Sequence, residues 1–598
     1  MSKVPINFRL EFQVMKFVIR MIWTLAPRFF IFTLMFCVCA SLSPVINLLF
    51  LKEIINGFAA NRFVQELLPV IVVMVVVNAI CYFLNLFLTE KMEEFTLSLN
   101  KDFQMQLGLK MMELDYMDLE NPIILNLREQ ALTPISTHNV IPRTINGMRN
   151  ILRSAFILLS MASFVAGLNP LLLLFIVGIV LLNSRIYSKM QKVQFDFHKK
   201  LAPINRKFGY YRMLASDFGM GKDVRMFGMG PYLLRKIETY NQESYAGFAG
   251  MFASVGSYKG KTNITIQVQL LAVYSYMVYK VYTGNLPIGS FLMYISAAAA
   301  FSAAFSEVVN GMTELRQMCH YLEPFQQFME LPTSRGKGSR SAEGLEKEFA
   351  IEFDKVSFKY PGAAHYTIKN LSFTVRNGEN LSIVGKNGAG KSTLIKLLCR
   401  LCEPESGEIR VNGINIQEFE RADYQKWLAV VFQDYSLFSF SLRDNILLGR
   451  SLEHEEQVLE GVLDKMGLKE KINRLDQGVD TFLTKQFNPE GIELSGGEGQ
   501  KLAIARALAQ RAACVVLDEP TAALDPYAEQ EIYSHFHELI DRKTALFISH
   551  RLSSCQFCNN IAVIENGELV EFGNHAALLN NNGLYAEMWN AQAQFYQE

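Results

Sequence analysis

The stretch Gly385-Lys-Asn-Gly-Ala-Gly-Lys-Ser-Thr393 follows the short apolar run Leu381-Ser-Ile-Val384 and precedes an amphipathic segment over residues 394–401. This order predicts a buried strand, a glycine-rich turn and a helix. Glycines let backbone N–H groups turn inward around phosphate oxygens at the helix N-terminus. Lys391 supplies a positive charge, and the Ser392 hydroxyl can bind Mg²⁺. We therefore expect a phosphate-binding loop whose contacts are Gly385, Asn387, Gly388, Gly390, Lys391, Ser392 and Thr393.

A second apolar run, Cys514-Val-Val-Leu-Asp-Glu-Pro520, ends in two carboxylates. Because the run has the length of a buried strand, Asp518 is expected at the strand end, where it can hold the Mg²⁺ shell. The next side chain, Glu519, would point elsewhere and could polarise an attacking water. Together with the phosphate loop, this pattern predicts an α/β P-loop NTPase domain.

Leu494-Ser-Gly-Gly-Glu-Gly-Gln500 resembles the signature motif of ATP-binding-cassette (ABC) proteins, and the family's other motifs follow the same order along the chain. By that resemblance, Tyr360 stacks on adenine, and Gln433 links Mg²⁺ and water to the membrane half. Asp525 lies in a loop at the dimer interface, and His550 is the switch histidine near the γ-phosphate. The resemblance covers essentially the whole chain. The chain is similar to ABC exporters in which one membrane domain is fused to one ATPase domain.

The resemblance implies that ATP and Mg²⁺ are the cofactors and that one chain cannot complete its own site. The signature residues Ser495, Gly496 and Gly497 of one subunit would close over ATP held by the phosphate loop of another. Glu519 and an intact signature are both present, so a homodimer is the simpler expectation, with a heterodimer of related half-transporters as the alternative. The predicted catalytic residues are Glu519, His550 and Gln433, and the predicted metal ligands are Ser392, Gln433 and Asp518.

Two positions depart from the family pattern. Exporters of this kind usually carry Gly-Glu-Arg-Gly before the signature, whereas this chain has Asn488-Pro-Glu-Gly491. The signature has Glu498 where glutamine is commoner, a change that we expect to be tolerated.

Apolar segments before about residue 320 have the length needed to span a bilayer. We expect six transmembrane helices, over residues 29–51, 67–87, 151–168, 171–186, 264–282 and 288–309. Basic residues concentrate in the N-terminal arm and in the two long connections, which the positive-inside tendency places in the cytoplasm with the ATPase half. We therefore predict a multi-pass protein of the bacterial plasma (inner) membrane.

The two long connections are charged and helical in pattern, so they should extend pairs of membrane helices into the cytosol. Residues 115–128 and 221–235 combine charged, aromatic and turn-forming side chains at the tips. We expect these tips to contact the ATPase half, the alternative being ordinary turns. The predicted domains are an all-α transmembrane domain (1–325), a linker (326–349) and the nucleotide-binding domain (350–598).

Net charge and cysteine spacing bear on two other kinds of partner, nucleic acids and metal ions. The chain has 598 residues with 58 basic and 58 acidic side chains, so its zero net charge gives no indication of a nucleic-acid partner. Cys399/Cys402 and Cys555/Cys558 have Cys-x-x-Cys spacing, but the pairs lie far apart in the sequence. We interpret them as reduced structural thiols, with a zinc site as the alternative.

The substrate is open at this level. Tyr274, Tyr276, Tyr279 and Tyr282, with Phe301 and Phe305, could line an amphipathic cavity, or could be interfacial aromatics and helix-packing residues. Glu307 is expected to be a hydrated carboxylate near the inner face. Because about 28 residues precede the first span in this sequence, we expect no N-terminal cysteine-peptidase domain. We predict export of a peptide natural product, a lipid-like molecule or a drug; import, such as metallophore uptake, and an ATP-gated channel or signalling role are the alternatives.

Overall fold

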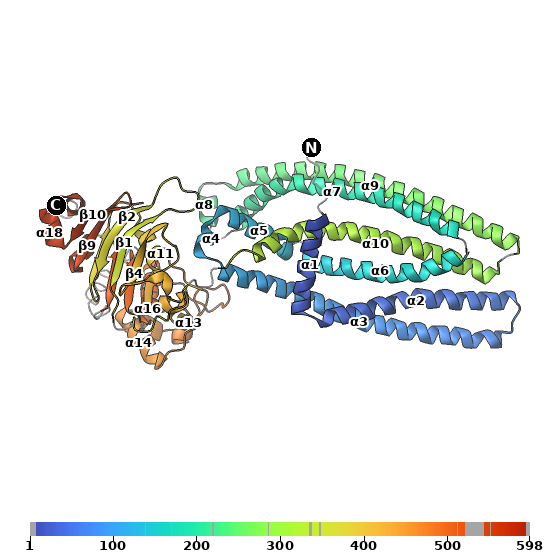
Figure 1. Cartoon of the computed structure of the whole chain (residues 1–598), viewed down its shortest axis with the longest axis horizontal. Coiled ribbons are helices and arrows are strands. Elements are labelled where there is room, and N and C mark those ends of the chain that lie inside the picture. Colours follow the sequence, from blue (N-terminus) through green and yellow to red (C-terminus); the bar gives the residue numbers. More distant parts are fainter. Residues whose placement is uncertain are drawn as a thin grey trace. The chain divides into compact units, whose positions relative to one another are not determined.

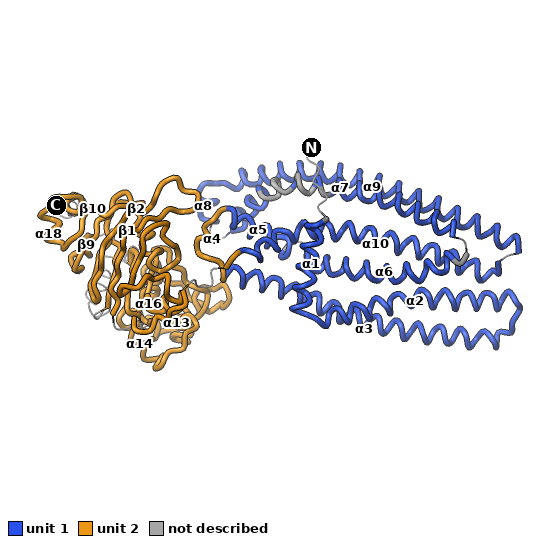
Figure 2. The backbone as a smooth tube through the Cα atoms, in the orientation of Figure 1, with its two compact units in different colours: residues 1–112, 123–331 blue, residues 113–122, 332–598 orange. Residues whose placement is uncertain are grey.

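The computed structural model describes residues 8–593 except 138, 169, 218–219, 285, 334–337, 346–347, 511, 521–542 and 550–551. The chain divides into two compact units (Figure 2). Unit 1 comprises Met1–Met112 and Ile123–Leu331, and unit 2 comprises Glu113–Pro122 and Pro332–Glu598. A ten-residue segment of the first half therefore belongs to the second unit.

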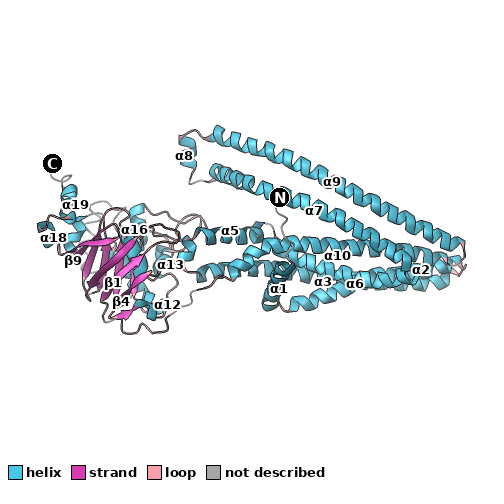
Figure 3. Cartoon of the chain, turned by 45° about the horizontal axis from the view of Figure 1, so that its top comes forward, coloured by secondary structure: helices cyan, strands magenta, loops and turns pink. Residues whose placement is uncertain are grey.

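Unit 1 is helical throughout its described part (Figures 1 and 3). Its long helices extend well beyond the apolar segments, as the charged patterning of the connections predicts. The helices are α1 (Phe8–Leu25), α2 (Arg28–Ala59), α3 (Val64–Glu113), α5 (Pro122–Thr137), α6 (Val140–Leu168), α7 (Pro170–Ser216), α8 (Gly221–Met226), α9 (Gly230–Tyr282) and α10 (Ile288–Met329).

Five of these helices are long and apolar enough to cross a membrane: α2, α3, α6, α7 and α10. The fifth predicted span, residues 264–282, lies within the continuous helix α9, which does not reach the same apolar character because Gln267 and Gln269 interrupt it. Gln269 is buried and accepts a hydrogen bond from the Ser302 hydroxyl of α10 (3.0 Å), so packing satisfies this polar group. The crossing of α9 stays a prediction.

Helix α10 packs against α6 and α2, and α7 runs beside α9. The small residues of α10 allow this close approach, since Ala297, Ala298 and Ala304 are buried and Phe301 is 5% exposed. These residues therefore take part in helix packing within unit 1, and the lining of a substrate cavity by this region stays a prediction. Glu307 is not a free carboxylate: it accepts hydrogen bonds from Arg153 (2.8 Å) and Ser154 (2.7 Å) of α6.

Unit 2 contains two sheets. The four-stranded sheet has the order β2-β1-β4-β5 and is antiparallel. The six-stranded sheet has the order β10-β9-β3-β8-β7-β6, in which all neighbours pair in parallel except β9 and β10. The strands are β1 (Ile351–Phe358), β2 (Ile368–Val375), β3 (Asn380–Val384), β4 (Ser406–Val411), β5 (Ile414–Asn415), β6 (Leu428–Val431), β7 (Cys514–Asp518), β8 (Thr544–Ile548), β9 (Asn560–Glu565) and β10 (Glu568–Gly573).

The carboxyl ends of β3 and β7 lie at the same edge of the parallel part of the sheet, separated by β8. Such edges are where ligands bind in α/β proteins. The helices of unit 2 are α4 (Tyr116–Glu120), α11 (Lys391–Leu398), α12 (Arg421–Gln425), α13 (Leu442–Leu447), α14 (Glu455–Lys465), α15 (Lys469–Asn473), α16 (Gly496–Leu508), α18 (His575–Asn580) and α19 (Leu584–Ala593).

The region predicted as a linker is more structured than its composition suggests. Helix α10 continues to Met329, and Ala342, Leu345 and Phe349 are buried in the core of unit 2. Apolar residues anchor the described end of this segment, whereas the Ser- and Gly-rich composition had indicated a spacer.

The cysteines of the first Cys-x-x-Cys pair are core residues of unit 2. Cys399 and Cys402 are buried, and burial raises the pKa of Cys399 to about 12.

Candidate nucleotide site

The phosphate loop connects β3 to α11, as predicted. Gly385 (φ +153°) and Gly390 (φ +102°) adopt backbone angles that side chains disfavour. A Cβ at Gly385 would lie 2.1 Å from the carbonyl oxygen of Ile564, so that position also needs glycine for close approach of the backbones. Asn387 is exposed near the tip of the loop, and a Cβ at Gly388 would meet open space.

Lys391 lies inside the loop that it follows. Its ammonium donates to the carbonyl oxygens of Gly385 (2.8 Å) and Lys386 (3.1 Å), and the residue is 6% exposed. Burial lowers the pKa of Lys391, while the nearby charges of Glu519 and Asp518 oppose that shift. These two carboxylates and the lysine therefore share one electrostatic environment at the sheet edge.

Asp518 ends β7 and is 2% exposed. Burial raises the pKa of its carboxyl group, and a hydrogen bond from the Ser392 hydroxyl opposes the shift. Its Oδ1 atom is buried and has no hydrogen-bond partner among the described residues. A carboxylate oxygen and a hydroxyl oxygen suit a hard cation, so Asp518 and Ser392 fit Mg²⁺.

Glu519 leaves the strand in a left-handed conformation (φ +50°), and its N–H donates to the carbonyl oxygen of Ile548 (3.0 Å). This turn separates its side chain from that of Asp518, as predicted from their adjacent positions. Glu519 Oε2 accepts a hydrogen bond from Gln433 Nε2 (2.9 Å). The structure thus brings two predicted catalytic residues together, on the carboxylate that would contact the attacking water.

Tyr360 lies on unit 2 beside the start of α11. Its hydroxyl is 3.2 Å from Thr393 Oγ1, and its ring packs edge-on against Phe358. Lys396, one turn further along α11, holds its ammonium 5.6 Å from the Tyr360 ring centroid. The predicted adenine-stacking residue is therefore linked directly to the helix that follows the phosphate loop.

The signature begins α16. Ser495 is the N-cap residue: its hydroxyl accepts from Glu498 N–H (3.3 Å), and Glu498 Oε2 accepts from Ser495 N–H (2.9 Å). This capping box explains why glutamate suits the position where the family usually has glutamine, because either side chain can close it. Glu498 also pairs with Lys471 (2.6 Å), which lowers the pKa of its carboxyl group.

Gln500 and Tyr435 belong to the site, although no role was predicted for either of them from the sequence. Gln500 is buried and its Nε2 donates to the carbonyl oxygen of Glu519 (3.1 Å), which joins α16 to the end of β7. Tyr435 donates its hydroxyl to the carbonyl oxygen of Gly496 (3.1 Å). Gln500 could have been predicted because it is the last residue of the signature motif. Tyr435 lies in no recognised motif, so nothing in the sequence pointed to it.

The predicted tip of the first long connection spans residues 115–128, and its part up to Pro122 belongs to unit 2 and packs on the core of that unit through Tyr116 and Met117. The predicted contact is confirmed for this part of the tip. Asp115 pairs with Arg421 (2.8 Å), and Glu120 pairs with Lys396 (3.0 Å). The Lys396 ammonium also lies 5.0 Å from the ring centroid of Tyr116. Lys396 therefore contacts both the predicted adenine-stacking tyrosine and helix α4.

Three predicted features stay untested by the described geometry. Asp525 and His550 lie outside the described residues. The second tip forms α8 in unit 1, where Met226 and Phe227 are exposed, and its contact with an ATPase domain stays a prediction.

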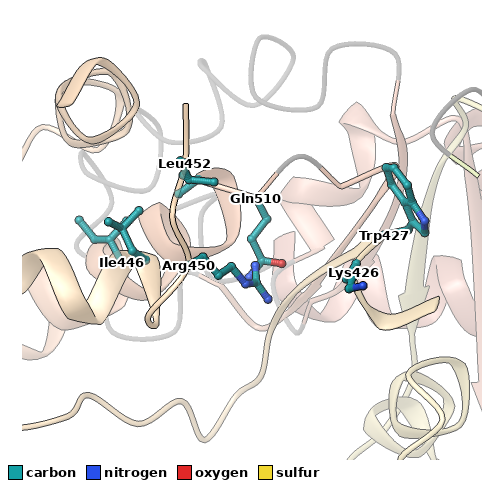
Figure 4. Close-up of a pocket in the computed structure, with 8 residues that line it drawn as sticks. Lys426, Trp427, Ile446, Arg450, Leu452 and Gln510 are labelled. Atoms are coloured by element: carbon teal, nitrogen blue, oxygen red, sulfur yellow. The ribbon is translucent and has the colours of Figure 1, made fainter. Parts of the chain in front are cut away.

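A cavity of about 270 Å³ occurs elsewhere in unit 2, lined mainly by apolar side chains (Figure 4). Its lining residues Lys426 and Trp427 directly precede β6. They therefore lie at the amino ends of the parallel strands, the edge opposite the phosphate loop. This cavity does not belong to the nucleotide site.

Comparison with known proteins agrees with this geometry. The ABC transporter family matches residues 368–522. The chain is 28% identical over 583 residues to the subtilin transport ATP-binding protein SpaT of Bacillus subtilis, covering 95% of this chain and 92% of the relative. It is 26% identical over 582 residues to the nisin transport ATP-binding protein NisT of Lactococcus lactis subsp. lactis, covering 96% and 95%. The chain is an ABC half-transporter. Its membrane and ATPase domains are fused.

Two further similarities bear on the half-transporter. An ATP-dependent lipid A-core flippase of Haemophilus influenzae is 34% identical over 308 residues, covering 52% of this chain and 51% of the relative. A bacterial Atm1-family ABC exporter with ATP bound has the same fold, with a TM-score of 0.75 and 22% identity over 95% of this chain and 99% of that chain. The half-transporter is thus a multi-pass membrane protein that binds and hydrolyses ATP to drive transport.

Proposed function

We propose that two copies of this chain form a homodimer that exports an amphipathic peptide across a bacterial inner membrane. The single observation that carries the cargo class is the coverage of the relatives. SpaT and NisT, whose names state subtilin and nisin transport, match over more than nine tenths of their length and of this chain. The flippase of Haemophilus influenzae matches over about half. A lipid-like cargo is the second candidate.

The exposed start of α16 supports the dimer. Ser495 and Gly496 are exposed, and the N–H groups of Gly496 and Gly497 have no acceptor within the described part of the chain. Free N–H groups at a helix N-terminus attract anionic oxygens. These groups would face the γ-phosphate of ATP held by the other subunit, where they would stabilise the charge that develops during hydrolysis.

Residues at the sheet edge have separable roles in this proposal. Lys391 and the loop N–H groups hold the phosphates, and Glu519 orients the attacking water and accepts its proton. Gln433 keeps the Glu519 carboxylate in place through the hydrogen bond at 2.9 Å. Asp518 and Ser392 would hold Mg²⁺, which neutralises phosphate charge when bound. Asp525 is proposed to lie at the dimer interface, and His550 is proposed to lie near the γ-phosphate.

Helix α4 is proposed to transmit the ATPase cycle to the membrane helices. Its ion pairs with Lys396 and Arg421 tie the end of α3 to the ATPase fold, and a movement of that fold would pull on α3. The basic connections and the bacterial relatives support a cytoplasmic ATPase domain.

Complementation between two inactive variants tests the shared site. Lys391→Ala disables the phosphate loop, and Gly497→Asp disables the signature of the other subunit's site. A mixed dimer keeps one intact site, so an equal mixture should recover about a quarter of wild-type sites. No recovery from well-folded mixed dimers would refute the shared site.

Cargo is tested separately by the ATPase activity of the wild-type chain in lipid nanodiscs, titrated with amphipathic peptides, lipid A and dyes. Stimulation by peptides, abolished in Glu519→Gln, is the expected result. Stimulation by lipid A alone would replace the peptide proposal with the lipid-like cargo. Steady activity in Glu519→Gln would overturn the catalytic assignment.

A further inference from the structure

Helix α1 has a protein-facing side and an exposed side with two different stripes. Val14, Val18 and Ile22 recur every four residues and are at most 1% exposed, so one face of the helix is buried against the rest of unit 1. The burial is specific: α1 packs on α10 and α2. The remaining faces of α1 are therefore free to meet the surroundings of the protein.

The first exposed stripe is apolar. It consists of Phe12 (70% exposed), Ile19 (36%) and Trp23 (61%), which share one side of the helix because their spacings are seven and four residues. The second stripe is basic, and a 100° turn per residue places it directly beside the first. It consists of Arg9, Lys16 and Arg20, all exposed.

The basic stripe has no acidic partner among the described residues. The acidic residue of α1, Glu11, lies on another side of the helix and is half-buried. It pairs with Arg316 of α10 (3.3 Å). None of Arg9, Lys16 and Arg20 forms an ion pair with a described side chain, so their charges are available to an external anion.

The chain itself places this helix at a membrane surface. Helix α1 ends at Leu25, and α2, which contains the first membrane span, begins at Arg28. An exposed stripe of Phe, Ile and Trp beside a bilayer is stabilised by burial at the boundary between headgroups and acyl chains. The adjoining basic stripe then lies at the level of the headgroup phosphates.

A groove between α1 and α10 has matching chemistry. It has a volume of about 540 Å³ and is lined by the apolar residues Phe12, Met15, Met312 and Leu315, by Cys319, and by the charged residues Arg9, Glu11 and Arg316. Arg316 is paired with Glu11, so Arg9 is the cation of this groove that can meet an anion. Arg9 beside apolar walls suits a lipid, whose phosphate and upper acyl chains need both a positive charge and apolar contacts. A soluble anion would not use the apolar walls.

We propose that α1 binds anionic phospholipids of the leaflet in which α2 begins, with Arg9, Lys16 and Arg20 holding the headgroups and Phe12, Ile19 and Trp23 contacting the acyl chains. The inference does not depend on the cargo. It concerns the lipid that surrounds the transporter and a helix outside the nucleotide site.

Tryptophan fluorescence tests this directly, because Trp23 is the only one of the three tryptophans outside unit 2; the others are Trp427 and Trp589. The full chain is reconstituted in bilayers of phosphatidylcholine, and brominated phosphatidylglycerol or brominated phosphatidylcholine is titrated in. Wild-type Trp23 should be quenched at a lower fraction of brominated phosphatidylglycerol than of brominated phosphatidylcholine. Added salt should reduce this difference.

Lys16→Gln/Arg20→Gln should raise the fraction of phosphatidylglycerol needed for half-quenching by about tenfold or more, while quenching by phosphatidylcholine stays unchanged. Lys16→Arg/Arg20→Lys should keep the wild-type preference. The matched control, Lys101→Gln/Arg235→Gln, removes two exposed charges from α3 and α9 and should have no effect. Equal quenching by the two lipids in the wild type, or an unchanged preference in the glutamine variant, would overturn the proposal.

Discussion

Lys396→Met should weaken the attachment of helix α4 to the ATPase fold without unfolding it. In the wild type, the Lys396 ammonium is 3.0 Å from Glu120 Oε1 and 5.0 Å from the Tyr116 ring centroid. Methionine keeps an unbranched chain of similar length and removes the ammonium group, with its charge and its hydrogen-bond donors. The second attachment, between Asp115 and Arg421, is left intact.

The expected loss follows from the burial of this pair. Lys396 and Glu120 are 23% and 35% exposed, so their ion pair should contribute at the upper end of the range for surface pairs, about 1 kcal/mol. The cation–π contact with Tyr116 adds about 1 kcal/mol. A total of about 2 kcal/mol corresponds to roughly 30-fold in the equilibrium between attached and detached α4.

Amide hydrogen exchange of the full-length transporter measures this equilibrium. The amides of residues 113–122 should exchange roughly 30-fold faster in Lys396→Met, in line with the loss above. Glu120→Gln should give a smaller increase, and the double variant should exchange less than the two single effects combined, because both remove the same ion pair. Lys369→Met, which removes a lysine 4.0 Å from Glu568, is the matched control. Unchanged exchange in Lys396→Met would refute the assignment of this residue to the attachment.

Three further predictions concern other parts of the chain. Glu498→Gln keeps the capping box and loses the ion pair, so it should destabilise the protein by about 0.5–1 kcal/mol at pH 7. Because the folded-state pKa of Glu498 is lowered, this difference in thermal unfolding should disappear as the pH falls through that pKa, and a constant difference would contradict the reasoning. Cys399 and Cys402, whose pKa values burial raises to about 12 and about 11, should resist iodoacetamide at pH 8 until the protein unfolds; rapid labelling of the native protein would show that they are accessible. Arg153→Met should cost about 1 kcal/mol because it removes the ion pair and leaves Glu307 with the hydrogen bond from Ser154 alone, and adding Glu307→Gln should restore part of the thermal stability; no restoration would mean that the pair is not the cause.

Local features of the site could be predicted from the sequence because each motif carries its own geometric requirement. The turn around Gly385 and Gly390 needs left-handed backbone angles, which glycine supplies. The order of strand and carboxylates in residues 514–519 places Asp518 and Glu519 on different sides of the chain. The helical character of the first half could also be predicted from the sequence, because a helix that spans a bilayer needs a minimum length of apolar residues.

Long-range contacts could not be predicted in the same way. Nothing in the sequence pairs Lys396 with Glu120 in particular, because charged side chains at a loop tip have many alternatives on a surface. Helix α1 was hidden for another reason: its charges had indicated only an orientation, and its three faces become visible once burial separates Val14 from its neighbours. Glutamines within α9 lowered its apolar character, although packing against α10 satisfies at least one of them.

The membership of residues 113–122 in unit 2 has a consequence for biosynthesis. Glu120 and Lys396 are separated by 276 positions, so at 5–20 residues per second α4 leaves the ribosome roughly 15–55 s before its partner is made. Tyr116 and Met117, which pack on the core of unit 2, have no surface to cover during that time. Conversely, an ATPase fragment that begins after α10 would expose the apolar site that these two residues normally fill. A soluble fragment for study would therefore benefit from a tethered copy of α4.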